Sequence, residues 1–199
     1  MDLKEGLRQM ARRFCPDQYY LRRYVRAARL LPNAGEARDR KFDAFVARSI
    51  QKPSMQIGVR GAKYAPHWVS VDLYDTSAYI DYHYDVCALG FKEACFDFVA
   101  CRAVLEHVQD PVRAIAELYR VLRPGDEIWV EVPFNQPYHL SPYDYWRVTP
   151  DGLRQWMKAF REIDCSLFSP DGNALYNGVY YHGKKPAPGE TPPGDSPAT

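Results

Sequence analysis

The sequence lacks any long hydrophobic run. No segment approaches the roughly 18 consecutive apolar residues that a membrane-spanning helix needs. The first residues, MDLKE, do not begin a secretory signal peptide. We therefore expect a soluble cytoplasmic protein that makes no contact with a membrane.

The cysteines are few in number, and their spacing forms no recognisable pattern. The chain has five cysteines, an odd number, and no two of them form a CxxC pair. This argues against a disulfide framework and against a zinc site. Isolated acidic residues and single histidines do not make a metal-binding pattern either. We expect reduced, mostly buried thiols and no metal.

The net charge is nearly zero, at +1, but it is unevenly distributed. Residues 1–50 hold twelve Lys and Arg against six Asp and Glu, which leaves a net charge of −5 for the rest. Apolar residues three or four positions apart predict helices within residues 3–10, 20–26 and 38–50. Residues 1–53 are thus expected to form a basic helical cap or lid for a phosphorylated or nucleotide-linked substrate. A plain solvated helix face is the alternative.

Internal repeats, a second domain and a nucleic-acid-binding pattern are also missing. No basic segment is interleaved with aromatic residues in the way that predicts binding to nucleic acid. Residues 54–185 are long enough for one α/β domain with its own core. From Lys184 onward the chain has five prolines and no large apolar residue, which predicts a disordered tail over residues 186–199.

Residues 96–134 carry the clearest structural pattern. Residues 96–101 and 127–132 are short apolar or alternating runs and predict strands. Between them, Asp110 and Pro111 suit the cap and the first position of a helix that ends before a Pro-Gly turn. A parallel strand pair joined by such a helix has its loops at the carboxyl ends of the strands, where open α/β sheets bind ligands.

This segment resembles class I S-adenosylmethionine-dependent methyltransferases, which commonly read FDxVxxxxVLEHVxDPxxAxxExxRVLxPGG. The resemblance implies a Rossmann-like α/β fold, with a mostly parallel seven-stranded sheet, a C-terminal antiparallel hairpin and, here, N-terminal helices. It also implies S-adenosyl-L-methionine as cofactor. In the family, the pair at Glu106 and His107 mostly supports the loop, so His107 is expected to be structural. Asp126 replaces the usual second glycine, a change that a turn can absorb.

The glycine motif expected after the first strand is irregular. Gly58 fits the family position, Gly61 is one step out of register, and the later glycines are replaced. Only seven residues, 62–68, separate Gly61 from the second strand at residues 69–72, too few for a crossover helix. The first crossover helix is therefore expected to be shortened or absent.

Other positions match cofactor-binding residues of the family. Asp72 ends the second strand, where a carboxylate can accept both ribose hydroxyls. Asp85 and Val86 match an acidic and apolar pair beside the adenine, and Arg102 and Ala103 match the loop beside the methionine part. The resemblance thus assigns cofactor binding to Gly58, Gly61, Asp72, Leu73, Asp85, Val86, Arg102 and Ala103.

Residues 133–153 resemble the family segment PFxxPxHxxPxDYWRxTPxGL, which leads into a helix at residues 150–160. His139 is the candidate general base, because methyl transfer to a hydroxyl becomes easier as its proton leaves. Asp144 is the candidate that orients this imidazole, and aromatic residues around them are candidates for the acceptor pocket. The alternative is a folded cap in which Asp144 pairs with Arg147.

The last predicted strands of the domain distinguish a methyltransferase from a nucleotide-dependent oxidoreductase. Strands are predicted at residues 80–86, 161–168 and 175–183, and the short link between the last two makes them antiparallel. That hairpin is typical of methyltransferase sheets and weighs against a nucleotide-dependent oxidoreductase. We favour O-methylation of a small molecule or carbohydrate acceptor by a methyltransferase, with a homodimer as a possible assembly. A catalytically inactive binding or scaffold protein is the alternative.

Overall fold

The computed structural model describes residues 34–58, 61–169 and 177–190. The helices predicted at residues 3–10 and 20–26 and most of the predicted tail lie outside these residues. The helical elements are α3 (Ala34–Arg48), the short 3-10 helix η1 (Leu105–His107), α4 (Pro111–Val121) and α5 (Pro150–Trp156). The strands are β1 (Ser54–Ile57), β2 (Trp68–Val71), β3 (Phe96–Arg102), β4 (Leu122–Asn135), β5 (Arg161–Phe168) and β6 (Asn177–Lys184). None of the described helices is both long enough and apolar enough to cross a membrane.

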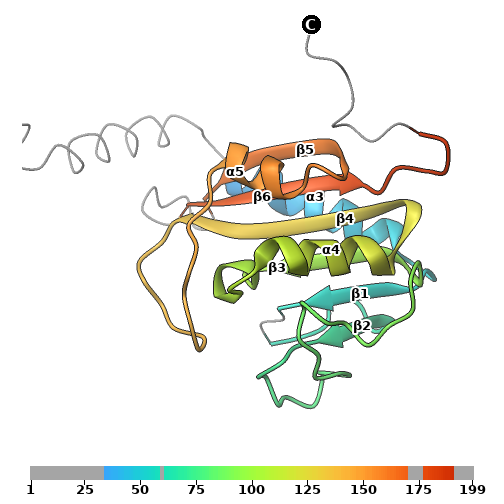
Figure 1. Ribbon diagram of the computed structural model, residues 1–199, viewed down its shortest axis with the longest axis horizontal. Coiled ribbons are helices and arrows are strands. Elements are labelled where there is room, and N and C mark those ends of the chain that lie inside the picture. Colours follow the sequence, from blue (N-terminus) through green and yellow to red (C-terminus); the bar gives the residue numbers. More distant parts are fainter. Residues whose placement is uncertain (1–33, 59–60, 170–176, 191–199) are drawn as a thin grey trace, which may run out of the picture.

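All the described strands form one sheet of six, in the order β2-β1-β3-β4-β6-β5 (Figure 1). Strand β1 pairs in parallel with β2 and β3, and β3 pairs in parallel with β4. Strand β6 lies between β4 and β5 and is antiparallel to both. The predicted Rossmann-like α/β class and the terminal antiparallel hairpin are therefore confirmed.

Helices cover both faces of the sheet, with α4 on one face and α3 on the other (Figure 1). Side chains alternate between the two faces along each strand. In β3, Val99 packs in one core cluster with Leu118 of α4, whereas Phe98 packs in a second cluster with Phe45 of α3 and Trp129 of β4. Part of the predicted N-terminal segment thus packs directly on the sheet, while the boundary at residue 53 stays a prediction.

Local capping residues set the start of the two helices that follow β3 and β4. The side chain of Asp110 accepts a hydrogen bond from the backbone N–H of Arg113 at 3.0 Å at the start of α4. The hydroxyl of Thr149 accepts one from the backbone N–H of Gly152 at 3.0 Å at the start of α5. Both helices therefore begin where the sequence predicts, although α5 is shorter than predicted and ends at Trp156.

The prediction of a seventh strand at residues 80–86 is not confirmed. Within the described residues this segment forms only an isolated bridge to β2, at Tyr82. Acidic side chains take up backbone donors that a strand would use: Asp81 accepts from the N–H of Ser70 at 2.8 Å, and Asp85 accepts from the N–H two residues later at 2.8 Å. Such hydrogen bonds from the backbone to side chains compete with a regular ladder.

Candidate functional site

The carboxyl ends of the parallel strands form one edge of the sheet, and the candidate residues gather there. The register places the last residue of β1 opposite Val71 of β2 and Cys101 of β3. Gly58, Asp72 and Arg102, the residues that come next in the three segments, therefore lie side by side. The chain runs from β1 to β2 on one side and returns to β3 on the other, so the strand order reverses at this point. Open α/β sheets bind ligands at such a reversal.

Gly58 makes a close backbone crossing between the loops that follow β1 and β3. Its φ is +77°, and a Cβ there would lie 2.2 Å from Val104 Cγ2 and 2.4 Å from the carbonyl oxygen of Arg102. Gly61 also has a positive φ, +87°, but no atom lies within 4 Å of its Cβ position. Among the described residues of this connection, 58 and 61–67 form no helix, as predicted.

A buried amide that the sequence reading did not single out shapes the same loop. Gln56 is completely buried in β1. Its Oε1 accepts the backbone N–H of Tyr64 at 2.7 Å, and its Nε2 donates to the carbonyl oxygen of Ala62 at 3.5 Å. A polar residue inside a short apolar strand was the available signal, because a buried amide requires hydrogen-bond partners.

Asp72 lies immediately after β2 and organises the turn that follows. Its Oδ1 accepts the backbone N–H groups of Tyr74 at 2.9 Å and Asp75 at 2.8 Å. Oδ2 takes no part in this turn and is the oxygen that can accept from a ligand hydroxyl. The neighbouring Leu73 is 42% exposed, so it can also contact a ligand at this edge.

The two residues expected beside the adenine lie in the loop between β2 and β3, in different environments. Asp85 is exposed, and its Oδ1 accepts the backbone N–H of Cys87 at 2.8 Å. Val86 is buried in the core cluster beneath α4. The carboxylate is thus presented at the surface, whereas the apolar side chain supports the loop from below.

At the end of β3, the Arg102 side chain points away from the ligand edge. Its Nε donates to Oε2 of the buried Glu131 at 2.8 Å, and its guanidinium lies 4.3 Å from the ring centre of Phe42. The next residue, Ala103, is exposed with a φ of +51°, and its N–H donates to the carbonyl of Glu131 at 3.0 Å. A left-handed conformation is uncommon for alanine, so the backbone is held in a special geometry at this edge.

The loop between β4 and α5 carries the candidate catalytic residues and projects from the carboxyl edge, at the left of Figure 1. Arg147 donates from Nη1 to Oδ1 of Asp144 at 2.6 Å and from Nη2 to Oδ2 at 2.7 Å. These bonds hold the pKa of Asp144 below its usual range. Asp144 also accepts the backbone N–H of His139 at 2.7 Å. It therefore fixes the backbone of His139, while its Oδ2 lies 3.7 Å from the imidazole Nδ1.

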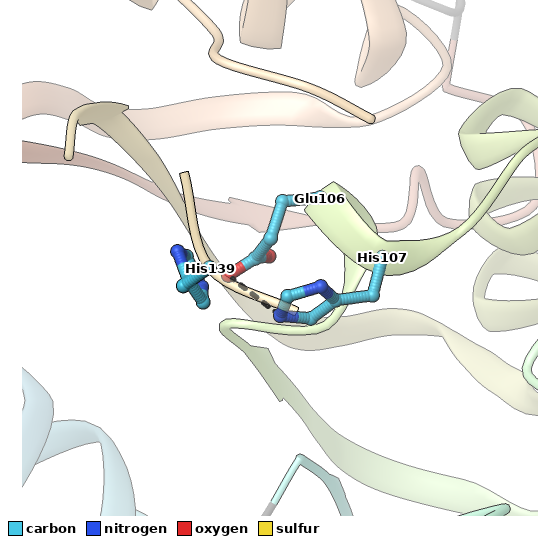
Figure 2. Close-up of side chains that lie close together, drawn as sticks. All are labelled: Glu106, His107 and His139. Carbon is cyan, nitrogen blue, oxygen red and sulfur yellow. Dashed lines mark ion pairs between the residues drawn. The ribbon is translucent and has the colours of Figure 1, made fainter. Parts of the chain in front are cut away.

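The structure brings His139 next to the Glu106 and His107 pair of η1, which the sequence did not predict. The two imidazole ring centres lie 5.0 Å apart and nearly perpendicular. Nε2 of His107 lies 3.7 Å from Oε1 of Glu106. Figure 2 shows the three side chains converging from η1 and the loop after β4. Burial lowers the pKa of His107 and so favours the neutral imidazole, and the hydrogen bond to the carbonyl of Tyr143 only partly opposes this effect.

Known proteins with a similar sequence or fold include methyltransferases, as expected from the ligand-binding edge of the sheet. The sequence model of a family described as a methyltransferase domain matches residues 60–130. The N-methyltransferase NodS from Bradyrhizobium japonicum, solved with S-adenosylhomocysteine, is 16% identical with a TM-score of 0.55, covering 84% of this chain and 97% of that one. A methyltransferase structure from Bacillus halodurans is 14% identical with a TM-score of 0.53, covering 71% of this chain and 99% of that one. Residues 60–130 thus match a methyltransferase domain, and the described residues have the fold of class I methyltransferases.

The predictions of a class I methyltransferase family and of S-adenosylmethionine as the family cofactor are thus confirmed. A curated relative of the methyltransferase domain is the tRNA U34 carboxymethyltransferase of Campylobacter curvus, 26% identical over 92 residues. The match covers 41% of this chain and 31% of that protein, so the chain spans about a third of this relative's length. The cyclase SpnF is a further structural neighbour, at 15% identity and a TM-score of 0.55 over 76% of this chain and 83% of that one.

Proposed function

We propose that this methyltransferase domain binds S-adenosylmethionine at the carboxyl edge of its sheet and transfers the methyl group to an oxygen of a small-molecule or carbohydrate acceptor. One observation carries the proposal. The strand register sets Gly58, Asp72 and the start of the β3 loop side by side at the reversal of strand order. The loop with His139 adjoins this edge through its contacts with η1.

For the cofactor, we propose that Oδ2 of Asp72 accepts the ribose hydroxyls while Oδ1 stays in its turn. Asp85, exposed on the next loop, would accept from the exocyclic amine of the adenine. Leu73 and the backbone at Gly61 and Ala103 would contact the remainder of the ligand. Arg102 would act from below, by holding the β3 loop through Glu131.

For the transfer step, we propose that His139 removes the acceptor proton as the oxygen attacks the methyl carbon and the C–S bond breaks. The nitrogen that would do so is Nε2, because Nδ1 lies 3.1 Å from the carbonyl of Pro137 and serves as the donor. Asp144 and Arg147 would fix the loop that presents this imidazole. Exposed aromatic residues around it would line the acceptor pocket; they are Tyr138, Tyr143, Tyr145 and Trp146.

The acceptor class stays a proposal. Its basis is the group of exposed aromatic side chains in the same loop as His139 and the missing basic and aromatic pattern for nucleic acid in the sequence. The curated relative is named for action on tRNA, so an RNA acceptor is an outcome that the experiment must include. We further propose that the protein works in the cytoplasm, away from membranes, and forms a homodimer that size-exclusion chromatography with light scattering would detect.

Substituting alanine for His139 is expected to lower kcat by about 10²–10⁴-fold, the range typical of a lost general base, and to leave the Kd for S-adenosylmethionine unchanged. Turnover would be measured with methyl-labelled cofactor against pools of sugars, small-molecule alcohols and RNA. His67→Ala is the matched control, since His67 is exposed and precedes the amino end of β2, at the opposite edge of the sheet. An unchanged kcat in His139→Ala would remove this residue from the mechanism.

A binding or scaffold protein without catalysis is the second candidate. It is favoured by the loop after β1, where Gln56 already engages the backbone of Tyr64 and Gly58 is packed against Arg102. Fold similarity alone does not decide between the two, as the cyclase among the structural neighbours illustrates. Cofactor binding without turnover on any acceptor pool would favour this candidate.

A further inference from the structure

Glu106, His107 and His139 form the one group of potential metal ligands found among the described residues. Each side chain can offer one donor atom, and the three donor atoms lie within 4.8 Å of one another. Two histidines and one carboxylate are a common ligand set for divalent transition-metal ions, which keep further positions open for water or a ligand. Bonds of about 2.0–2.2 Å in tetrahedral geometry place ligand atoms about 3.4 Å apart, so binding an ion requires the side chains to draw together.

The hydrogen bonds of both imidazoles leave Nε2 as the nitrogen for coordination. Nδ1 of His107 lies 2.5 Å from the carbonyl oxygen of Tyr143 and therefore donates to it. Nδ1 of His139 lies 3.1 Å from the carbonyl of Pro137. Donation from one ring nitrogen to a backbone carbonyl, with the other nitrogen turned to the ion, is the usual arrangement of metal-bound histidine.

Arg147 approaches the same ring but does not change this assignment. Its Nη2 lies 3.4 Å from Nδ1 of His139. The same nitrogen donates at 2.7 Å to Asp144 and at 2.8 Å to the carbonyl of Pro137. Both of its hydrogens are thus already used in shorter bonds, so Nδ1 of His139 keeps its own hydrogen.

The three candidate ligands are partly or fully shielded from solvent, and the nearby arginine is paired. The Glu106 side chain is 1% exposed, and the two imidazoles are only partly exposed, at 13% and 32% for His107 and His139. The positive charge of Arg147 is offset by its two-point pairing with Asp144.

The two segments that supply the ligands are fastened to each other. The carbonyl of Glu106 accepts the backbone N–H groups of Tyr145 at 2.7 Å and Trp146 at 3.3 Å. The indole Nε1 of Trp146 donates to the carbonyl of Val108 at 2.8 Å. The loop after β4 is therefore held against η1 by bonds outside the ligand cluster, so the ligand set is preorganised.

We propose that Glu106, His107 and His139 bind one divalent transition-metal ion at the carboxyl edge of the sheet. The bound ion would join η1 to the loop after β4 and leave coordination positions open toward the acceptor side. It would use the Nε2 lone pair that the proposed general base also uses, so the two roles exclude each other in one molecule. In the loaded form the cation, as a Lewis acid, would lower the pKa of an oxygen bound to it.

Metal binding is tested on full-length, tag-free protein after treatment with a chelator. Zn²⁺ titration by calorimetry should show one saturable site per chain, and Co²⁺ should give visible absorption bands of a site with nitrogen and oxygen ligands. Glu106→Gln, His107→Ala and His139→Ala should each weaken binding by about 100-fold or more, since loss of even an outer partner of a ligand costs about 10–100-fold. His67→Ala should bind as the wild type does.

The proposal is overturned if the wild-type chain shows no saturable one-to-one binding, or if the three variants bind as His67→Ala does. Intense sulfur-to-cobalt bands would also overturn it, because they would place the ion on a cysteine. Glu106→Gln keeps the shape of the side chain, and circular dichroism of each variant would separate lost ligands from lost folding. The titration uses no cofactor or acceptor, so its result is independent of methyl transfer.

Discussion

Asp72→Ala is expected to abolish measurable binding of S-adenosylmethionine. The variant removes Oδ2, the proposed acceptor of the ribose hydroxyls, and also Oδ1, which holds the turn through Tyr74 and Asp75. Hydrogen bonds to a charged group contribute about 1.5–3 kcal/mol each, so losing two of them weakens binding on the order of 100-fold or more. Calorimetric titration with the cofactor and with S-adenosylhomocysteine measures the change.

Asp72→Asn is the matched variant for this experiment. Its amide oxygen can still accept from the backbone N–H groups of the turn, but the amide nitrogen cannot accept from a ribose hydroxyl. We expect Asp72→Asn to melt at the same temperature as the wild type and to bind the cofactor clearly more weakly. Wild-type affinity in both variants would contradict the assignment of the ribose site to Asp72.

Gly58→Ala is expected to destabilise the fold far more than Gly61→Ala, although both glycines have a positive φ. The left-handed conformation costs about 1–2 kcal/mol for alanine at either position. At Gly58 the added Cβ would also meet Val104 at 2.2 Å and the Arg102 carbonyl at 2.4 Å, whereas at Gly61 it would meet nothing within 4 Å. Overpacking adds about 1–3 kcal/mol, so the Gly58 variant should lose about 2–5 kcal/mol in total.

Urea denaturation of the two glycine variants measures this difference directly. Equal losses of unfolding free energy would show that the crossing of the β1 and β3 loops is not tight. The comparison bears on function as well. If Gly58 mainly allows the loops after β1 and β3 to cross closely, it is required for folding even though the rest of the glycine motif is replaced.

The most accurately predicted parts of the fold are those where local signals agree with long-range packing. Strand β3, helix α4 and strand β4 combine a cap at Asp110, an apolar helix face and β-branched strands, and the structure has all three elements. The antiparallel hairpin of β5 and β6 followed from a short connection. By contrast, residues 80–86 have the composition of a strand, yet the side chains of Asp81 and Asp85 accept backbone hydrogen bonds there, from Ser70 of β2 and from Cys87.

The candidate site was predicted less completely, because it depends on residues that meet only in the fold. The sequence suggested that Asp72 would stand at a strand end, and the structure places it at the carboxyl edge. Nothing in the sequence showed that His139 would lie beside Glu106 and His107, since they belong to different loops. For Asp144, the sequence allowed two roles, orientation of an imidazole or pairing with Arg147, and the structure contains the pair with Arg147.

Calorimetric titration of the wild-type chain with S-adenosylmethionine and, in parallel, with NAD tests the central claim most directly. Ligand binding at the carboxyl edge through Asp72 predicts saturable one-to-one binding of S-adenosylmethionine and S-adenosylhomocysteine. It predicts no binding of NAD, since the antiparallel hairpin of β5 and β6 is typical of methyltransferase sheets. Failure to bind S-adenosylmethionine, or saturable binding of NAD in its place, would contradict the proposed function.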